Sequence, residues 1–392
     1  MRINLNQENA SKNKQQSGTL PPLSNKVAGR VFPNFTRLLA CEPRKFGYAI
    51  VGLGNYAINQ ILPAFSECQH ACVTALVSGN KEKSNRIAEQ YGIEKSHLYS
   101  YEDFDKIADD PEIDAVYIIL PNSLHAEFTI RAFKAGKHVL CEKPMAVTVE
   151  ECQNMIKAGK EAGKKLMIGY RCHFDPVTQK AISIACGDQL GKLKIIETTN
   201  AQMLNPTDSA GQWRLNKKLA GGGSLIDNGI YGINGSRYLL NEDPIEVKAT
   251  FVPTDNPIFK EVEDRILWAM FYRSGVVSHG ICSYSTNVTS HFSLIGDKAT
   301  LLLDPATTYW ANKVSLRQSM HHISSFKSTF KFDQLNQFSA QLDHLPISIA
   351  RKSETLATGE EGMQDLRLIK AIYEAAYNNS SVSTDWGDWR QA

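Results

Sequence analysis

The chain has 392 residues, 42% of them hydrophobic and 21% charged, which is typical of a globular protein with two or three domains. Its formal net charge of +2 excludes the strongly basic surface that general binding to nucleic acid or to an anionic membrane would require. No apolar run approaches the length of a membrane span, so we expect neither partner.

The first 45 residues differ in composition from the rest. Met1–Gly18 is rich in Asn, Gln, Lys and Ser and has no apolar run, so it is predicted to be disordered. Residues 19–45 carry four prolines among scattered apolar residues, which favours an extended arm lying on another surface over a plain flexible tail. No apolar segment follows Arg2, so this stretch is not a secretory signal.

The eight cysteines form no CxxC pair and, with the histidines, no zinc-binding spacing. We therefore predict no metal site and expect reduced, mostly buried thiols. The absence of a disulfide pattern favours a reducing compartment. We expect a cytoplasmic protein; a periplasmic location is the alternative if an export signal has been trimmed.

The first ordered element expected is a strand that leads into a glycine turn. The apolar run 46–51 precedes Gly52-Leu53-Gly54 and, three residues later, Ala57, and an amphipathic helical pattern follows. This is the context that a dinucleotide-binding fingerprint requires. Gly52 permits the tight turn, Gly54 lets the backbone approach a pyrophosphate, and Ala57 allows close helix–strand packing.

The end of the next strand, 72–77, indicates which dinucleotide is bound. An NAD site usually places Asp or Glu here to bind the ribose 2′-hydroxyl. The chain instead has Ser78, followed by Lys81 and Lys83, and a small hydroxyl beside lysines can accept a 2′-phosphate. NADP is therefore favoured. The lysines could also lie on an exposed first helical turn, and Glu82 keeps NAD open.

Helices and strands continue to alternate up to Gly169. Helices are expected over 83–91, 101–110, 123–135 and 148–163, the last opened by a Thr148–Glu151 capping box, and strands over 113–120, 138–142 and 165–169. Ser123 is predicted to cap its helix. Repeated strand–helix units of this length require a parallel, doubly wound sheet, so 46–169 is predicted to be a dinucleotide-binding domain.

The chain is organised around the strand 138–142, which ends in Glu142-Lys143-Pro144. Ligands bind at the carboxyl ends of strands in open α/β sheets, so Lys143 is placed to meet a ligand. The alternative is a surface lysine at a strand end, the usual place for this residue.

After Gly169 the pattern changes to strands without intervening helices. A helix to about Cys186 is followed by candidate strands at 194–201, 245–252, 264–272, 276–283, 290–295 and 300–303, and by a late helix at 361–377. Residues 170–392 are therefore predicted to form an α+β domain with a large, mostly antiparallel sheet.

A second motif lies within this domain. Three glycines at 221–223 precede a helical run that carries Asp227 and Tyr231. Residues four apart project from one helix face, so a carboxylate and a phenol would face Lys143 as a proton-transfer set. The structural alternative is a helix-start carboxylate and a packing tyrosine.

Taken together, these motifs resemble the Gfo/Idh/MocA oxidoreductase family. The likeness runs from about Phe46 to Trp389 and includes the glycine turn, Glu142-Lys143-Pro144 and the run 221–234. It implies a Rossmann domain joined to an open-faced sheet domain that serves substrate binding and oligomerisation, a homodimer or homotetramer, and an NADP that stays tightly bound. The cofactor contacts it implies are Gly52, Gly54, Ala57, Ser78, Lys83, Tyr101, Pro121, Asn122, His125, Glu142, Lys143, Arg171, Trp213 and Arg214.

The resemblance also implies a reaction and its catalytic residues. An aldose is oxidised to its lactone, and the bound cofactor then reduces a ketose, as in fructose to sorbitol, or a second aldose. Lys143, Asp227 and Tyr231 are implied as catalytic. Tyr231 is the expected proton carrier, because a neighbouring ammonium favours the phenolate, and Asp227 is the alternative base. An NADP-dependent sugar dehydrogenase with an exchanging cofactor and a non-catalytic NADP-binding sensor remain as rival functions.

Overall fold

The computed structural model describes residues 26–27, 30–31, 45–208, 211–320, 324–332 and 335–387. Within the predicted N-terminal arm, β1 (Lys26–Val27) pairs antiparallel with β2 (Arg30–Val31). The rest of the predicted arm, apart from residue 45, lies outside the described residues, and so do the end of the chain and three short internal stretches.

The first domain is built on a six-stranded parallel sheet, as predicted. Its spatial order is β5-β4-β3-β6-β7-β8, so the first strand along the chain lies next to the second and the fourth. This is the doubly wound order in which ligands bind where the strand order reverses. The strands are β3 (Phe46–Val51), β4 (Ala71–Val77), β5 (Leu98–Tyr99), β6 (Ala115–Ile118), β7 (His138–Glu142) and β8 (Leu166–Gly169).

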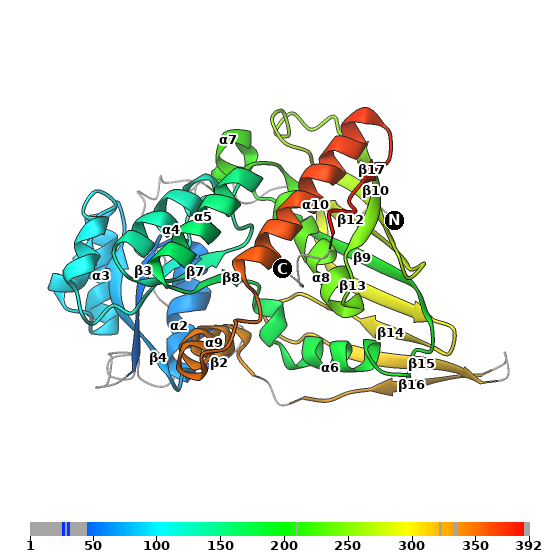
Figure 1. Cartoon of the computed structure of the whole chain (residues 1–392), viewed down its shortest axis with the longest axis horizontal. Coiled ribbons are helices and arrows are strands. Elements are labelled where there is room, and N and C mark those ends of the chain that lie inside the picture. Colours follow the sequence, from blue (N-terminus) through cyan, green and yellow to red (C-terminus); the bar gives the residue numbers. More distant parts are fainter. Residues whose placement is uncertain are drawn as a thin grey trace, which may run out of the picture.

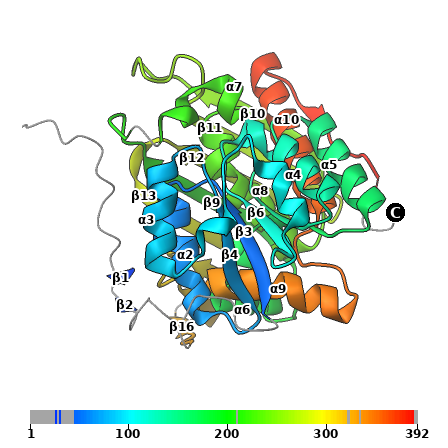
Figure 2. The same cartoon turned by 90° about the vertical axis from the view of Figure 1, so that its left-hand side faces the viewer.

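Helices cover both faces of this sheet (Figure 2). One apolar core joins the sheet to α4 (His125–Lys134) and α5 (Val149–Ala162), and the other joins it to α2 (Leu62–Ala64) and α3 (Lys81–Tyr91). The predicted Thr148–Glu151 capping box opens α5. The predicted Ser123 cap is wrong, because a 3-10 turn (Asn122–Leu124) precedes α4 and Leu124 occupies the cap position.

A helix from late in the chain completes the first domain. α9 (Gln337–Arg351) places Phe338, Leu342 and Leu345 in the core on the α3 side of the sheet. The Asp343 carboxylate accepts hydrogen bonds from the backbone N–H groups of residues 69–71 at 2.7–2.9 Å. The two domains are therefore joined by more than one crossing of the chain.

The second domain is built on a nine-stranded sheet of order β16-β15-β14-β13-β9-β12-β11-β10-β17. Only the β9–β12 pair is parallel, so the sheet is mostly antiparallel as predicted. Its strands are β9 (Leu193–Met203), β10 (Pro244–Val252), β11 (Arg265–Tyr272), β12 (Val277–Ser283), β13 (Ser285–Gly296), β14 (Ala299–Leu303), β15 (Val314–Met320), β16 (Ser324–Thr329) and β17 (Val382–Ser383). The last three were not predicted.

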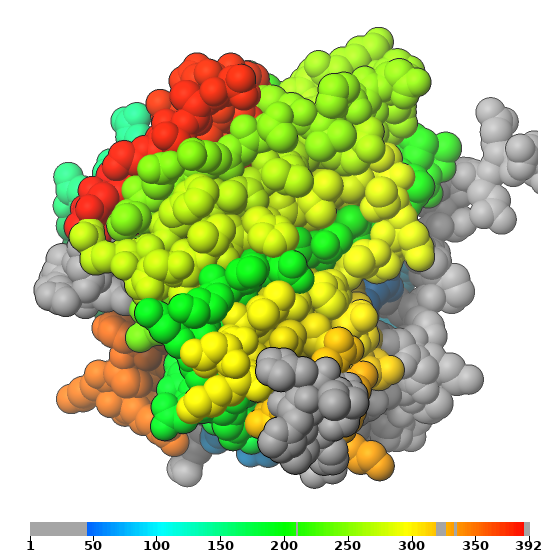
Figure 3. Space-filling view, turned by 90° about the vertical axis from the view of Figure 1, so that its right-hand side faces the viewer, coloured from blue at the N-terminus to red at the C-terminus, as the bar shows by residue number. Residues whose placement is uncertain are grey.

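One face of the large sheet is covered by helices and the other is open. α6 (Pro176–Ala185), α8 (Ile230–Leu240) and α10 (Gly359–Asn378) pack on the side that faces the first domain (Figure 1). The strands of the opposite side are spread over the molecular surface (Figure 3). Leu267 on β11 is 44% exposed and Ile195 on β9 is 38% exposed there, so the sheet presents apolar side chains outward.

The cysteines differ in one respect from the sequence-based expectation. Six described cysteines are free, and five of them are buried. Cys72, however, is disulfide-bonded, so the expectation that the thiols are all reduced is wrong at this position.

None of the helices in the described part of the chain is long and apolar enough to cross a membrane. The described His, Cys, Asp and Glu side chains form no group of three or more that could hold a metal ion.

Candidate active site

The turn after β3 has the geometry that a dinucleotide requires. Gly52 has φ +94°, and a Cβ there would lie 2.2 Å from the Ile119 carbonyl oxygen, so only glycine fits. A Cβ on Gly54 would meet no atom within 4 Å, which leaves open space in front of the turn. Ala57 is fully buried at the start of the following helix. The three residues therefore fit the cradle for a pyrophosphate.

The predicted 2′ site lies at the end of β4. Ser78 is buried, and its hydroxyl oxygen accepts from the Asn80 N–H at 3.2 Å. Asn80 caps α3 through the Lys83 N–H, and the Lys83 ammonium donates to the Leu53 carbonyl in the glycine turn at 3.1 Å. Tyr101 lies beside Gly79, where an added Cβ would be 3.2 Å from its ring. No carboxylate occupies the position of Ser78 at the strand end.

The loops after β6 and β7 are tied together by a buried imidazole. His125 places Nδ1 2.8 Å from the Pro144 carbonyl oxygen and Nε2 2.9 Å from the Leu120 carbonyl oxygen. Asn122 donates from its side chain to the Ala220 carbonyl at 2.8 Å, while Pro121 is half-buried at the start of this loop. These contacts hold the sheet edge against the glycine run 221–223.

Glu142 forms part of the buried support of Lys143. Its carboxylate accepts from the Tyr117 hydroxyl at 2.5 Å and from the backbone N–H of Lys143 at 3.2 Å. Burial raises the pKa of Glu142 above its usual value, against the opposing effects of Tyr117 and Lys143. Gln341 of α9 donates to the Tyr117 hydroxyl at 3.1 Å, so the support of Lys143 extends into the second half of the chain.

Lys143 and Asp227 meet across the two domains. The Lys143 ammonium donates to the Asp227 Oδ1 at 3.0 Å and to its backbone carbonyl at 2.9 Å. Asp227 Oδ2 accepts from Arg214 Nε at 2.9 Å and from the Tyr284 hydroxyl at 3.0 Å. Although burial acts in the opposite direction, the positive charges of Lys143 and Arg214 hold the pKa of Asp227 well below its usual range. Asp227 is therefore an ionised, fully engaged carboxylate.

Tyr231 lies between two cations. The Lys143 ammonium is 4.8 Å from the centroid of its ring, and Arg171 Nη2 donates to its hydroxyl oxygen at 3.3 Å. Burial alone would lower the pKa of Lys143, but the neighbouring Tyr231 oxygen and the Asp227 carboxylate outweigh it and raise the value. The phenol is half-buried, and its hydroxyl oxygen lies within reach of Arg171.

Arg171 is held rigidly from the second domain. Its guanidinium donates to the Thr307 carbonyl at 2.6 Å, the Thr308 carbonyl at 3.2 Å and Gln337 Oε1 at 2.7 Å. Its charged carbon lies 4.7 Å from the ring centroid of Tyr309. The nearby Trp213 ring lies against its sequence neighbour Arg214, whose charged carbon is 4.5 Å from that ring.

The structure thus brings Lys143, Asp227 and Tyr231 together, as the motifs predicted, with Arg171 and Arg214 beside them. Sequence reasoning missed Tyr284, which contacts Asp227, and Tyr309 and Gln337, which contact Arg171. It also missed Tyr117, which contacts Glu142. Gln337 lies within the span from Phe46 to Trp389 over which the chain resembles the family, but outside the motifs that carry the resemblance. The three tyrosines had no signal, because each lies in a strand or loop with no motif around it.

Comparison with known proteins identifies the two halves of the chain. Residues 46–170 match the family described as "Oxidoreductase family, NAD-binding Rossmann fold", the GFO_IDH_MocA family. Residues 186–384 match its companion, "Oxidoreductase family, C-terminal alpha/beta domain". Together the matches span more than half of the chain.

Individual relatives cover most of the chain. An NADP(+)-dependent D-xylose 1-dehydrogenase from Haloarcula marismortui is 29% identical over 339 residues, 86% of this chain and 93% of that protein. A crystal structure of aldose-aldose oxidoreductase from Caulobacter crescentus, complexed with glycerol, is 44% identical with a TM-score of 0.82 and covers 87% of this chain and 100% of that one. Levoglucosan dehydrogenase, in complex with NADH and levoglucosan, has a TM-score of 0.75 at 21% identity over 86% of this chain and 99% of that one, which shows the shared fold.

Proposed function

The chain belongs to the Gfo/Idh/MocA oxidoreductase family, and from this premise we propose that it is an NADP-dependent sugar oxidoreductase that passes hydride from one sugar to another. The observation that carries the proposal is Tyr231 with its hydroxyl on Arg171 and its ring beside Lys143. The sequence similarity to the aldose-aldose oxidoreductase of Caulobacter crescentus, at 44% identity, supports it.

We propose that Tyr231 accepts the hydroxyl proton of an aldose and returns it in the second half-reaction. Arg171 and Lys143 place positive charge beside the phenol, so they stabilise the phenolate that forms. Asp227 is a poor base, because Lys143, Arg214 and Tyr284 already donate to its oxygens. Its role in this proposal is to hold Lys143 in position.

A bound NADP would supply the hydride acceptor for C1 of the aldose and, once reduced, the hydride donor for the second sugar. The residues proposed to hold the dinucleotide are those that the family resemblance implies. They lie in the glycine turn after β3, at the end of β4, in the loops after β6 and β7, and around Arg171 and Arg214. The lactone is the oxidised product. The reduced product is either a polyol from a ketose, as in glucose–fructose oxidoreductase, which the motifs resemble, or one from a second aldose.

The rival functions differ in how the cofactor behaves. A sugar dehydrogenase on the same fold would release its cofactor in every turnover, and a non-catalytic sensor would bind it without chemistry. The absorbance spectrum of the purified protein, taken before and after glucose and then fructose or xylose, separates the three. Bound cofactor that is reduced by the first sugar and reoxidised by the second supports our proposal, whereas protein purified without nicotinamide argues for the exchanging dehydrogenase.

We expect Ser78→Asp to shift the cofactor preference from NADP to NAD. An aspartate oxygen can still accept from the Asn80 N–H, so the turn should survive, but its charge would repel a 2′-phosphate. The ratio of the NADP and NAD dissociation constants, measured by titration of cofactor-stripped protein, should change by at least about tenfold, which is about 1.4 kcal/mol.

Ser96→Asp is the matched control for this measurement. It adds the same charge to the first domain at an exposed position, where the preference should stay within about twofold. An unchanged preference in Ser78→Asp would refute the assignment of the 2′ site to the end of β4.

We also propose that the protein is a homodimer or homotetramer that associates through the open face of the large sheet. The exposed Leu267 and Ile195 on this face support the proposal, because apolar patches on a sheet are usually covered. Light scattering should give a multiple of the mass of one chain, and Leu267→Lys should shift it toward the single chain. Leu356→Lys, at an exposed leucine outside the sheet, should leave the mass unchanged; a wild-type protein of single-chain mass would contradict the proposal.

The compartment is a further proposal. The sequence favoured the cytoplasm, but the disulfide at Cys72 supports the periplasmic alternative, because disulfides persist in oxidising compartments. Fractionation of the native host would decide between the two.

A further inference from the structure

A second hollow lies on the side of the second domain where α7 (Lys217–Ala220), β10 and α10 meet. Its volume is about 460 Å³, and the loop 253–264 forms one wall. This size is within the range of small-molecule pockets. The hollow includes Gly221 and Gly222 of the glycine run, but its lining includes neither Lys143 nor Tyr231.

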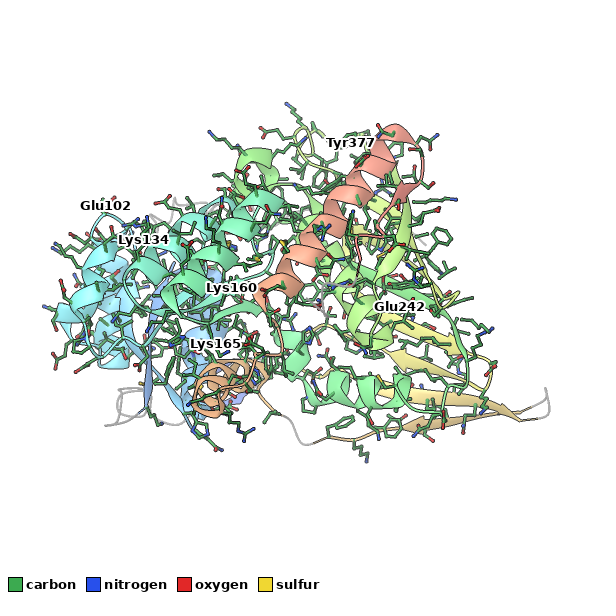
Figure 4. All side chains as sticks on the ribbon, in the orientation of Figure 1. Glu102, Lys134, Lys160, Lys165, Glu242 and Tyr377 are labelled. Atoms are coloured by element: carbon green, nitrogen blue, oxygen red, sulfur yellow. The ribbon has the colours of Figure 1, made fainter. Side chains whose placement is uncertain are left out.

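Aromatic side chains form one wall of this hollow. Phe251 of β10 and Tyr373 of α10 are stacked at 25° with centroids 6.3 Å apart, and Tyr377 packs 4.9 Å from Phe251. Tyr377 lies at the C-terminal end of α10, where its side chain reaches the surface (Figure 4), and it is 67% exposed. An aromatic wall that is open to solvent suits a ligand with an apolar face, such as a sugar ring.

The acidic residues of the lining are already engaged. Glu263 accepts from the N–H groups of Gly223 and Leu225 at 2.9 and 2.8 Å, and from the Tyr373 hydroxyl at 2.8 Å. The Glu261 carboxylate accepts from the Lys217 N–H at 3.1 Å. Asp264 accepts from Ser285 at 2.6 Å and pairs with Arg265 at 3.2 Å.

The lysines of the lining are not engaged in the same way. No ion pair or ammonium hydrogen bond joins Lys217, Lys260 or Lys370 to any other residue that the structure describes. Lys370 is half-buried, and burial, followed by the positive charge of Lys217, lowers its pKa below the usual value, against the opposing effects of Glu151 and Glu263. An anion between Lys217 and Lys370 would offset the cost of burying the ammonium and the repulsion between the two lysines.

We propose that this hollow binds a sugar-sized organic anion, a polyol skeleton that carries one carboxylate or phosphate. The lysines of α7 and α10 would bind the anionic group, and the Phe251–Tyr373–Tyr377 wall would cover the carbon skeleton. The acidic side chains of the lining are held in place by the hydrogen bonds described above, and none of them forms an ion pair with the three lysines among the described residues. This hollow is separate from the candidate active site around Tyr231.

Calorimetric titration of the purified full-length protein tests the proposal. Sodium gluconate and glucose 6-phosphate are the two anionic probes, and the tighter of them identifies the anionic group. Sorbitol and inorganic phosphate are the controls for the skeleton alone and the charge alone, and each should bind at least about tenfold more weakly. Equal binding of either control would overturn the class of ligand, and no binding of either anionic probe would overturn the site.

Charge-removing variants locate the bound anion. Lys370→Met keeps the aliphatic stem of the side chain and should lower the affinity for the anion by at least about tenfold. Lys217→Met, at an exposed position, should lower this affinity by a similar factor. It serves as the test variant if Lys370→Met fails to fold. Lys134→Met, at the exposed end of α4 (Figure 4), should change the affinity less than about twofold. Wild-type affinity in both pocket variants would overturn the location.

A competition separates this site from the active site. Saturating neutral glucose should leave the affinity for the anion unchanged. Displacement of the anion by glucose would mean that the anion binds in the candidate active site with Tyr231. Because the readout is binding, the result stands even if the proposed sugar oxidoreductase activity fails.

Discussion

Tyr231→Phe should slow both half-reactions of the proposed cycle by at least about a hundredfold, the usual contribution of one general acid–base group. The substitution removes one oxygen, which accepts from Arg171 at 3.3 Å, and leaves the ring beside Lys143. Folding and cofactor binding should therefore persist. Rapid mixing with glucose measures reduction of the bound cofactor, and later mixing with fructose or xylose measures its reoxidation, both in the near-ultraviolet absorbance of reduced nicotinamide.

Tyr272→Phe is the matched control for the lost hydroxyl. It removes a buried phenol oxygen from β11, whose neighbour is Ser278 at 3.3 Å, and both half-reactions should keep their wild-type rates. If Tyr231→Phe reduces its cofactor as fast as the wild type, Tyr231 is a packing residue. Asp227 would then become the candidate base despite its three donors, and Asp227→Asn would be the next variant to measure.

Arg237→Met should lower the free energy of unfolding by about 3–5 kcal/mol, the cost of breaking a buried ion pair from one side. Arg237 lies on α8 with no exposed surface. Its guanidinium donates to Asp365 and, at 3.0 Å, to Glu361 on α10, and to Asp243 at 2.5 Å. Methionine fills similar volume but leaves these carboxylates without their cation. Denaturant titration followed by circular dichroism measures the change.

The pH dependence of this loss distinguishes charge from packing. Burial raises the pKa of Asp365 to about 7 against the opposing charge of Arg237, so without that cation the folded-state pKa of Asp365 should rise further above its unfolded value. The variant is then stabilised at low pH and loses that stability as the pH rises. The difference from wild type should therefore be smaller at about pH 5 than at about pH 8; a difference independent of pH would indicate lost packing alone.

Arg273→Met is the control for the removal of a salt bridge. Arg273 pairs with Asp385 at 2.7 Å, with side chains 70% and 50% exposed. Exposed pairs contribute about 0–1 kcal/mol, so this variant should unfold close to the wild-type midpoint. A loss as large as that of Arg237→Met would contradict the distinction between buried and exposed pairs on which the prediction rests.

Local patterns determined much of the architecture. The strand before Gly52, the strand that ends in Glu142 and the Thr148–Glu151 cap follow from apolar runs and from hydrogen bonds within a few residues. The strands β15 and β16 were missed. The second is an outer strand with one apolar residue, Phe326, and such a strand is held mainly by backbone pairing, which leaves little pattern in the sequence.

The features of the candidate active site also divide into those that local sequence determined and those that the tertiary structure decided. The sequence by itself determined that a lysine ends a parallel strand and that Asp227 and Tyr231 share a helix face, because strand ends and helical spacing are local properties. Only the tertiary structure decided which charge each group meets. Lys143 pairs with Asp227, whereas Arg171, fixed by carbonyls 136 and 137 residues away, reaches the Tyr231 hydroxyl. Such pairings depend on how two domains dock, and docking depends on the whole packed interface, which no local pattern encodes.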